Sequence, residues 1–335
     1  MASNRFLAPA FPVPFHSVQP LNPPIAFHHP GYPSPRLSLL FVLPRVDPTG
    51  NQECPNGVHH RTALLACQIV AGNAFDGALY TDREGQHPAQ THPDGVLEND
   101  EYFFIVKNNY RLQYPVVPSF RDWTFPHGQV PDSWPTIYPE DYAAITRRCF
   151  LTNHANGLEE AHVVPREEAD WFWREQMGQY VGMGGIDSGM NLIWLRADIH
   201  RVYDSHAFII VPKKEILGPT DQQSPRSNYV VHCLSRYAGE FWNLYNNVPV
   251  QQIAHTSREL HFARFALAII PLVEEFVLAG QARQVLRVKC GEPKSENLTG
   301  SELKQFYGRG MEEEEEGPYL SEVEDCRERE EDWAM

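Results

Sequence analysis

The chain has 335 residues, of which 42% are hydrophobic and 21% charged, and its formal net charge is −15. A chain of this length and composition has enough apolar material for packed domains, so collagen, coiled-coil and wholly disordered proteins are excluded. The negative charge argues against a protein that coats nucleic acid or an anionic membrane through bulk charge alone. Six irregularly spaced cysteines indicate a reducing, intracellular compartment rather than a disulfide framework, with nucleus and cytoplasm both open.

The N-terminal segment is rich in proline, with nine of the chain's 28 prolines in the first 35 residues. Because proline fixes φ and has no N–H donor, this segment is predicted to form neither a regular helix nor a central strand. Residues 1–36 are therefore expected to be a disordered, extended arm. The segment has no uninterrupted apolar run long enough for a signal peptide, so secretion is not expected.

Residues 37–135 contain short apolar runs separated by clusters of Gly, Pro, Asp and Asn. This pattern predicts a β-rich domain with one short helix, whose role the sequence does not indicate. Histidines occur in this domain without the spacing of metal ligands, and surface or loop positions are expected for them. They are His59, His60, His87, His92 and His127.

A second domain is predicted over residues 138–290. It begins with a helix-like segment, PEDYAAITRRC, and continues with a strand at AHVVP, a glycine-rich turn and a strand at NLIWL. The polar segment RADIHRVYDSH is interpreted as a helix, and FIIVPKK returns as a strand. A long apolar helix over Ser257–Ala279 closes the domain. Its proline and glutamates favour a buried helix over a membrane span.

The C-terminal segment is acidic, since residues 291–335 contain 15 Asp and Glu against 5 Lys and Arg. Dense like charges repel one another and remain solvated. This segment is predicted to be a disordered tail. For the two domains that precede it, the alternation of strands and helices predicts an α+β fold.

Four polar residues of the second domain are candidates for catalysis: His162, Asn191, His200 and Asp204. His200 and Asp204 are four residues apart, so on a helix they share one face and can direct a ring nitrogen and a carboxylate oxygen toward one divalent ion. The same spacing occurs in ordinary surface neighbours. Spacing alone therefore leaves both interpretations open.

The order of these residues resembles the HNH endonuclease superfamily, in which a histidine on one strand, an asparagine before a second strand and a histidine on a helix form a ββα-metal unit. The two motifs are AHVVP at Ala161–Pro165 and NLIWLRADIHRVYD at Asn191–Asp204, a combination frequent in predicted fungal proteins. The resemblance covers roughly Arg148–Lys214 and says little about residues 1–135. It implies a small ββα-metal core wrapped by helices and preceded by the β-rich domain.

The resemblance also implies a metal-dependent endonuclease that hydrolyses phosphodiester bonds in DNA. In this interpretation His162 is the general base that takes a proton from water, and Asn191 holds that histidine or its loop in place. His200 and Asp204 bind a single divalent ion, for which Mg²⁺ is expected and Mn²⁺ or Zn²⁺ is an alternative.

One position departs from the family's pattern, because many HNH nucleases have a metal-binding Asp or His just before the base, where this chain has Ala161. Glu160 lies two residues before His162, so a strand places both side chains on one face, and Glu160 is a candidate replacement ligand. Successive acids before a strand are also common as solvated residues. A catalytically degenerate module that binds nucleic acid or a protein partner without cleavage is therefore the alternative function.

The expected nucleic-acid partner is DNA, with RNA left open. Because the chain is acidic overall, it has to bind this partner through local positive charge. Arg166, Arg196 and Arg201 are candidate phosphate contacts. Residues 141–230 contain 12 acids and 9 bases, so ordinary surface charge is an equal alternative. A structural interaction protein with incidental polar residues is a third interpretation, and the oligomeric state is not indicated.

Overall fold

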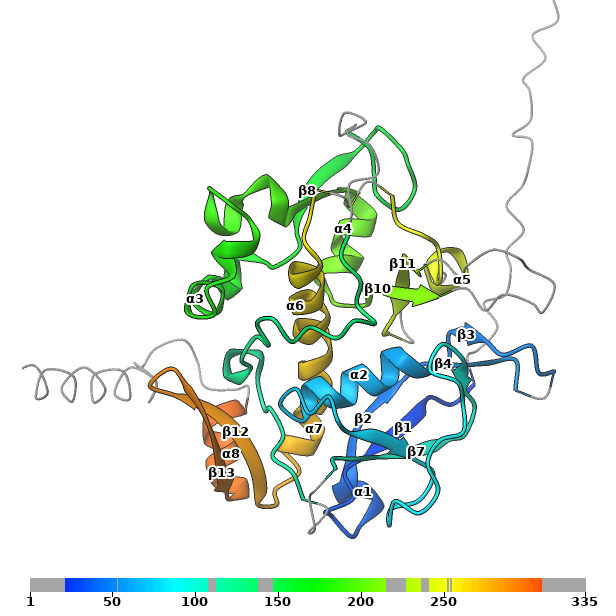
Figure 1. Cartoon of the computed structure of the whole chain (residues 1–335), viewed down its shortest axis with the longest axis vertical. Helices are drawn as coiled ribbons and strands as arrows, with labels where there is room; N and C mark the ends of the chain where they lie inside the picture. Colours follow the sequence, from blue (N-terminus) through cyan, green and yellow to red (C-terminus); the bar gives the residue numbers. More distant parts are fainter. Residues whose placement is uncertain are drawn as a thin grey trace, which may run out of the picture.

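A computed structural model of the chain describes residues 22–308 apart from 53, 108–112, 138–146, 215–226, 236–240, 252 and 254. The described residues form an α+β fold, as predicted, with several small sheets and short helices arranged around helix α6 (Arg258–Ile269) (Figure 1). Three predicted features lie outside the described residues: the first 21 residues of the arm, the start of the helix expected from residue 138, and the glutamate run of the tail.

The N-terminal region contains a four-stranded sheet with the strand order β2-β1-β7-β5. The strands are β1 (Ile25–His28), β2 (Leu39–Leu43), β5 (Ala78–Tyr80) and β7 (Glu101–Ile105). β1 pairs antiparallel with β2 and parallel with β7, so it is an interior strand. Helix α2 (His60–Val70) lies beside this sheet (Figure 1), and α1 (Pro35–Ser38) is a single turn before β2. The expected β-rich region with a short helix is therefore present.

The predicted proline-rich arm is wrong at its C-terminal end, because β1 lies inside the segment assigned to it. Ile25 and Phe27 of this strand are fully buried. Pro23 and Pro24 precede the strand and Pro30 lies after it, so the four residues of the strand keep their N–H groups for pairing. A proline count over 36 residues does not detect so short a strand.

Three further strands form a second small sheet next to α2. They are β3 (Asp47–Pro48), β4 (Asn56–His59) and β6 (Val96–Leu97). The expectation that His59 and His60 lie at the surface is wrong, since both are buried where β4 passes directly into α2. His59 Nδ1 lies 2.9 Å from the Thr62 hydroxyl, and His60 Nδ1 lies 2.9 Å from the Thr91 carbonyl. Both rings therefore have partners at the junction of strand and helix.

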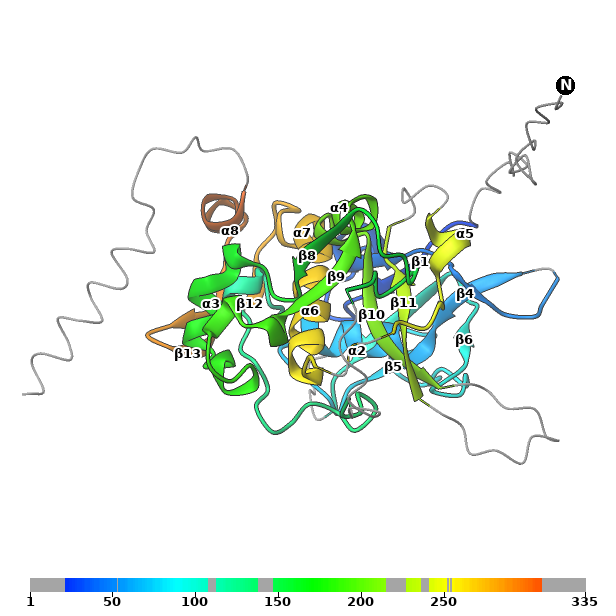
Figure 2. The same ribbon diagram turned by 90° about the horizontal axis from the view of Figure 1, so that it is seen from above.

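The region after residue 147 contains two antiparallel strand pairs, β8 with β9 and β10 with β11. Its elements are β8 (Leu158–His162), α3 (Ala169–Arg174), β9 (Leu192–Arg196), α4 (Ala197–Asp204), β10 (Phe208–Lys214), β11 (Ser227–Cys233) and α5 (Phe241–Tyr245). In Figure 2, β8 and β9 lie between α4 and α6. The strands at NLIWL and FIIVPKK and the helix after NLIWL are confirmed, and the first predicted strand ends at its histidine rather than beginning there.

Helix α6 is the central helix, and ten of its twelve residues are buried. The single helix predicted over Ser257–Ala279 is interrupted by a 3-10 turn at Ile270–Val273, after which α7 (Glu274–Val277) follows. Pro271 explains the interruption, because it has no N–H for the helical hydrogen-bond ladder. Throughout the part of the chain that the structure describes, no helix is long and apolar enough to cross a membrane.

The C-terminal described residues form a hairpin and a helix beside the central part of the molecule (Figure 1). The elements are β12 (Arg283–Lys289), β13 (Glu292–Leu298) and α8 (Gly300–Tyr307). The predicted disordered tail from residue 291, and the end of the second domain at residue 290, are therefore wrong for residues 292–307.

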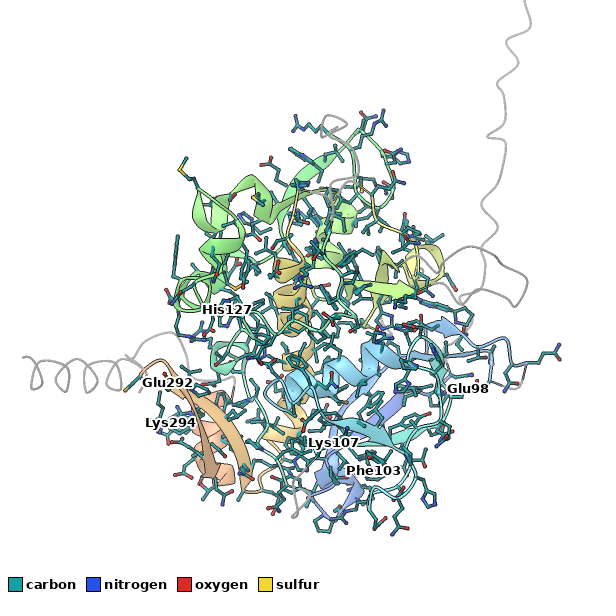
Figure 3. All side chains as sticks on the ribbon, viewed as in Figure 1. Glu98, Phe103, Lys107, His127, Glu292 and Lys294 are labelled. Atoms are coloured by element: carbon teal, nitrogen blue, oxygen red, sulfur yellow. The ribbon has the colours of Figure 1, made fainter. Side chains whose placement is uncertain are left out.

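The sequence of β13 appears as polar as a tail because most of its side chains face solvent. Glu292 and Lys294 point away from the hairpin in Figure 3. The strand is held by its pairing with β12 and by an ion pair between Lys289 Nζ and Glu296 Oε1 at 2.6 Å. Thr299 then starts α8 with a capping box, which satisfies the first backbone donors of that helix.

One hydrophobic core continues across the boundary predicted between residues 135 and 138. The ring of Trp123 stacks on that of Trp171, with centroids 5.6 Å apart and planes 9° apart. Trp123 also packs against Phe262 of α6, and Trp134 Nε1 donates to the Arg258 carbonyl at 3.1 Å. The two predicted domains share these contacts, so the boundary does not separate two independently packed units.

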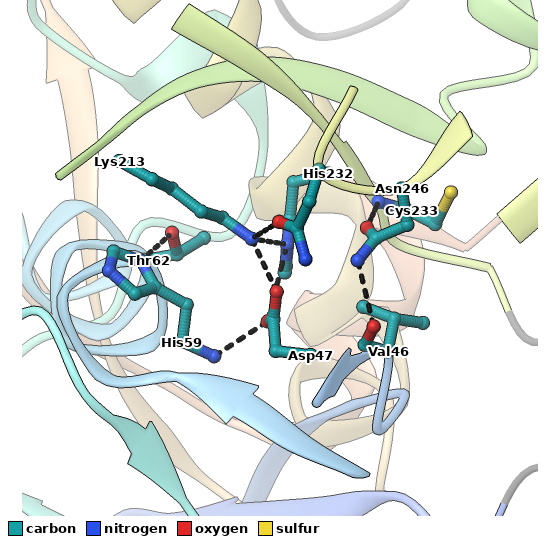
Figure 4. Close-up of polar contacts among 9 residues, drawn as sticks. Val46, Asp47, His59, Thr62, Lys213, His232, Cys233 and Asn246 are labelled. Carbon is teal, nitrogen blue, oxygen red and sulfur yellow. Dashed lines mark hydrogen bonds and ion pairs between the residues drawn. The ribbon is translucent and has the colours of Figure 1, made fainter. Parts of the chain in front are cut away.

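A buried polar cluster joins the N-terminal region to β10 and β11 (Figure 4). Lys213 Nζ of β10 lies 2.5 Å from Asp47 Oδ1 and 3.0 Å from His232 Nδ1. Lys213 Nζ also donates to Asn247 Oδ1 at 2.6 Å, and the His59 N–H donates to the other Asp47 oxygen at 2.7 Å. Burial alone would raise the pKa of Asp47, but Lys213 and His232 hold this pKa below its usual range. The ion pair fixes β10, the strand that follows α4.

Candidate active site

Strands β8 and β9 and helix α4 form one local unit, and α4 starts at the residue after β9. In the strand register, His162 pairs with Leu192 and Ala161 pairs with Ile193. Side chains alternate along a strand, so the fully buried Ala161 and Ile193 share one face and His162 points to the other. The His162 side chain is 20% exposed, which leaves its ring accessible to water. The predicted order of strand, strand and helix is therefore confirmed.

Asn191 is completely buried just before β9. Its Oδ1 accepts from the Val164 N–H at 2.9 Å, and its Nδ2 donates to the Val164 carbonyl at 2.8 Å. Nδ2 also donates to the Ile186 carbonyl at 2.8 Å, and the Asn191 carbonyl accepts from the Val163 N–H at 2.8 Å. Val163 and Val164 directly follow His162. The amide therefore fixes the end of β8 that carries the histidine, which supports the positioning role expected for Asn191.

His162 contacts an acid that the sequence analysis missed. Its Nε2 lies 3.1 Å from Asp187 Oδ1, and the same oxygen accepts from Arg166 Nε at 2.7 Å. Hydrogen bonds from Arg166 and His162 lower the pKa of Asp187 below its usual value. In the sequence Asp187 is one acid in a glycine-rich turn, four residues before Asn191, and that signal does not identify its partner.

His200 of α4 lies between two carboxylates. Its Nε2 lies 3.2 Å from Asp204 Oδ2, so the predicted contact across one helical turn is confirmed. Its Nδ1 lies 2.9 Å from Glu159 Oε2 of β8. Glu159 shares the face of Ala161, whereas Glu160 alternates to the face of His162. The acid of β8 that contacts the helix is therefore Glu159, and the role of Glu160 as a metal ligand stays a prediction.

The side chains of His200 and Asp204 supply two neighbouring donors suited to a divalent ion. Glu159 holds the other ring nitrogen of His200, as a carboxylate commonly does for a metal-binding histidine. Within the described ranges, no group of three or more His, Cys, Asp or Glu side chains is arranged to hold a metal. Two protein donors suit Mg²⁺, which keeps several waters, better than Zn²⁺, which usually takes three or four protein ligands. The residues fit a largely hydrated ion.

The three arginines expected to contact phosphate differ in their surroundings. Arg166 is 67% exposed and bound to Asp187. Arg196 makes two contacts with Asp198, at 3.0 and 2.5 Å. Arg201 is exposed on α4, with no ion pair to any residue that the structure describes. Two of the three charges are therefore neutralised by a neighbouring acid.

Comparison with known families agrees with this geometry. Residues 144–211 match the family described as HNH endonuclease, and the match contains β8, β9 and α4 with the residues discussed above. No curated protein and no solved structure matches the chain. Residues 144–211, which include the ββα unit, are therefore similar to the HNH endonuclease family.

Proposed function

We propose that this HNH domain is a metal-dependent endonuclease that hydrolyses phosphodiester bonds in DNA. The observation that carries the proposal is the ββα unit, in which buried Asn191 fixes the end of β8 next to His162 and a His–Asp pair lies on the adjoining helix. A water-accessible histidine, an amide that positions it and a pair of metal ligands are the groups that such a hydrolysis needs.

His162 takes a proton from the attacking water in this proposal. An imidazole side chain can both accept and release a proton near neutral pH, which suits a general base. The backbone bonds from Asn191 to Val163 and Val164 keep the strand end in one position. Substrate binding therefore does not have to order the segment that carries the His162 ring.

His200 and Asp204 would hold the divalent ion, and Glu159 would keep the His200 ring in the orientation that binding requires. A bound ion supplies stabilisation of the negative charge that develops on the phosphate and the leaving oxygen. Mg²⁺ is the first choice because only two protein donors are in place, and Mn²⁺ and Zn²⁺ are the alternatives to compare.

The proposed substrate is DNA, contacted through its phosphates by Arg201 and Arg166. With a chain net charge of −15, binding rests on a few local contacts rather than on a basic surface. We therefore expect modest affinity with a shallow salt dependence, because the slope of log affinity against log salt is proportional to the number of phosphate contacts.

The test is cleavage of supercoiled plasmid by the full chain with Mg²⁺, Mn²⁺ or EDTA, beside the variant His162→Ala. Loss of a general base should lower the rate about 10²–10⁴-fold. The matched control is His87→Ala, which removes another exposed histidine hydrogen-bonded to an aspartate, His87 Nδ1 to Asp82 Oδ2 at 3.1 Å. This control should cleave like the wild type, and EDTA should abolish cleavage by both.

A second candidate function is a degenerate HNH module that binds nucleic acid or a protein without cleaving. Ala161 favours it, because this residue supplies no ligand at a position where the resemblance to HNH nucleases leads us to expect one. A folded wild type that binds Mn²⁺ but nicks no plasmid with any ion would support this module and contradict the endonuclease. Nicking that persists unchanged in His162→Ala would contradict the assignment of the base.

We also propose that the protein acts inside the cell. Three buried cysteines, Cys67, Cys149 and Cys233, are free thiols. Imaging of a fluorescent fusion, with alkylation and mass spectrometry of the protein isolated from those cells, would test the location and the thiol state together. Recovery from the medium with all thiols oxidised would contradict the proposal.

A further inference from the structure

The pair formed by Asp187 and His162 determines which ring nitrogen carries the proton. Asp187 Oδ1 lies 3.1 Å from His162 Nε2, and the hydrogen bond from Arg166 at 2.7 Å keeps the carboxyl ionised. An ionised carboxylate only accepts hydrogen bonds, so Nε2 must be the donor in this contact. In the neutral ring the lone pair is then on Nδ1.

The backbone on both sides of this pair is held by the same buried amide. Asn191 Nδ2 donates to the carbonyl of Ile186, the residue before Asp187, and to the carbonyl of Val164, two residues after His162. Ser188, the residue after Asp187, donates from Oγ to the Val181 carbonyl at 2.8 Å. The contact between Asp187 and His162 therefore rests on a fixed frame rather than on two free surface side chains.

Arg166 and Asp187 are open to solvent on one side. Their side chains are 67% and 55% exposed, whereas His162 is 20% exposed. Both Arg166 and His162 use the same oxygen of Asp187. A phosphate that draws Arg166 away leaves this oxygen to His162 alone, which makes the ring a better proton acceptor because a competing cation is removed.

We propose that Asp187 is the positioning residue of His162, holding the Nε2–H so that Nδ1 accepts the proton from water, and that Arg166 couples phosphate binding to this pair. The proposal rests on the proposed nuclease function and adds the residue that sets the tautomer of the base. In this role Asp187 acts through the histidine and contacts neither the attacking water nor the scissile phosphate.

The first test compares Asp187→Asn and Asp187→Glu in the full chain. An asparagine side chain can turn its amide toward Nε2 and favour the wrong tautomer, as the corresponding change does in serine proteases. We expect kcat for plasmid nicking to fall at least tenfold in Asp187→Asn with KM within twofold, and Asp187→Glu to recover most of the loss. The control Asp82→Asn alters the exposed Asp82–His87 pair and should leave both constants unchanged.

The second test reads the tautomer directly and does not depend on cleavage. Long-range ¹H–¹⁵N spectra of histidine-labelled protein, with the His162 signals assigned by their loss in His162→Ala, should show the Nε2–H form in the wild type. The Asp187→Asn variant should show a mixture or the Nδ1–H form. If the wild type is inactive but shows the Nε2–H tautomer, and Asp187→Asn loses it, the nuclease function is contradicted. The positioning role of Asp187 is then supported on its own.

A third variant tests whether Arg166 couples phosphate binding to the pair of Asp187 and His162. Arg166→Gln should raise KM severalfold without lowering kcat, because the charge that competes for Asp187 is removed along with the phosphate contact. If Asp187→Asn keeps both the wild-type kcat and the Nε2–H tautomer, the contact is an ordinary surface ion pair and the proposal is overturned. If Arg166→Gln lowers kcat as far as Asp187→Asn does, the proposed coupling is wrong.

Discussion

Two clusters in this protein combine histidine, aspartate and a cation in different surroundings. One contains Asp47, Lys213 and His232 between the N-terminal region and β10, and its side chains are 4%, 12% and 0% exposed. The other contains Asp187, Arg166 and His162 at the end of β8, with 55%, 67% and 20% exposure. The residue types are nearly the same, and the solvent access differs by an order of magnitude for the aspartates.

The difference in solvent access leads us to expect a structural role for the buried cluster and a catalytic role for the exposed one. In the buried cluster each charge is held by its partners, because an unpaired charge there would be costly. In the exposed cluster a hydrogen bond can be exchanged for water or phosphate at little cost. Variants of the first cluster should therefore change stability, and variants of the second should change catalysis.

The largest expected effect is on stability, from Lys213→Met. This change leaves the buried Asp47 carboxylate without its cation, and we expect the free energy of unfolding to fall by about 3–5 kcal/mol. Urea unfolding followed by circular dichroism measures it. The double variant Asp47→Asn with Lys213→Met should recover part of the loss, since it removes both charges. A loss below about 1 kcal/mol would mean that the pair is not the contact that joins the two regions.

Acid should destabilise the protein through its buried histidines. Burial lowers the pKa of His59 from 6.5 to about 4 and that of His232 from 6.5 to about 3. Both rings are neutral when folded but take up a proton near pH 6.5 when unfolded, so stability is complete above pH 6.5 and falls as the pH decreases toward 4. Linkage gives about 2 kcal/mol for each ring between pH 7 and pH 5.

Urea unfolding at these two pH values measures this loss. His232→Gln should weaken the pH dependence, because it removes one of the titrating rings, and exposed His87→Ala should not change it. Equal unfolding free energies at pH 7 and pH 5 in the wild type would show that the buried rings are not kept neutral by the fold.

Asn191→Ala should affect both stability and catalysis. The residue is buried, like the cluster of Asp47, but it holds the backbone beside His162 and Asp187. Its loss leaves the backbone groups of Val164 and Ile186 without a partner, at a cost of about 1–3 kcal/mol in stability. Cleavage should fall as well, since His162 and Asp187 are no longer held together. Thermal unfolding and plasmid nicking on the same preparation separate the two effects. Unchanged nicking with reduced stability would limit Asn191 to packing.

The smallest effect is expected from single arginines on the surface. Arg201→Ala should weaken DNA binding at low salt and reduce the salt-dependence slope by about one unit, since one phosphate contact is lost. Arg196→Ala should do less, because Asp198 already neutralises that charge. Fluorescence anisotropy of a labelled duplex over a salt series compares the two. A larger loss of DNA binding in Arg196→Ala than in Arg201→Ala would indicate that the ion pair between Arg196 and Asp198 breaks when DNA binds.

Features carried by neighbouring residues could be predicted from the sequence. The ββα order follows from AHVVP and NLIWLRADIHRVYD, because strand, turn and helix signals lie next to one another in the chain. The contact between His200 and Asp204 follows from helical periodicity alone. The interruption of the last long helix is also local, since Pro271 breaks it.

Features that depend on which segments pair with each other were missed, whether the partner is distant or adjacent in the chain. β1 is interior only because it pairs with β7, about 75 residues later, and β13 is ordered because it pairs with β12. Asp187, which contacts His162, lies 25 positions after it in the sequence. Composition contains no information on these contacts. The predicted arm and tail therefore included residues that the structure places in β1, β13 and α8.

The sequence by itself determined which residue types stand in which order, and hence the resemblance to HNH endonucleases, the histidine on its strand and the His–Asp pair on its helix. The tertiary structure alone decided which face of β8 meets α4, and so made Glu159 rather than Glu160 the partner of His200. It also decided that Asp187 and His162 meet, and that Asp47 and Lys213 do so inside a shared core. Local signals act over one turn or one strand, whereas burial and charge pairing depend on where distant segments pack.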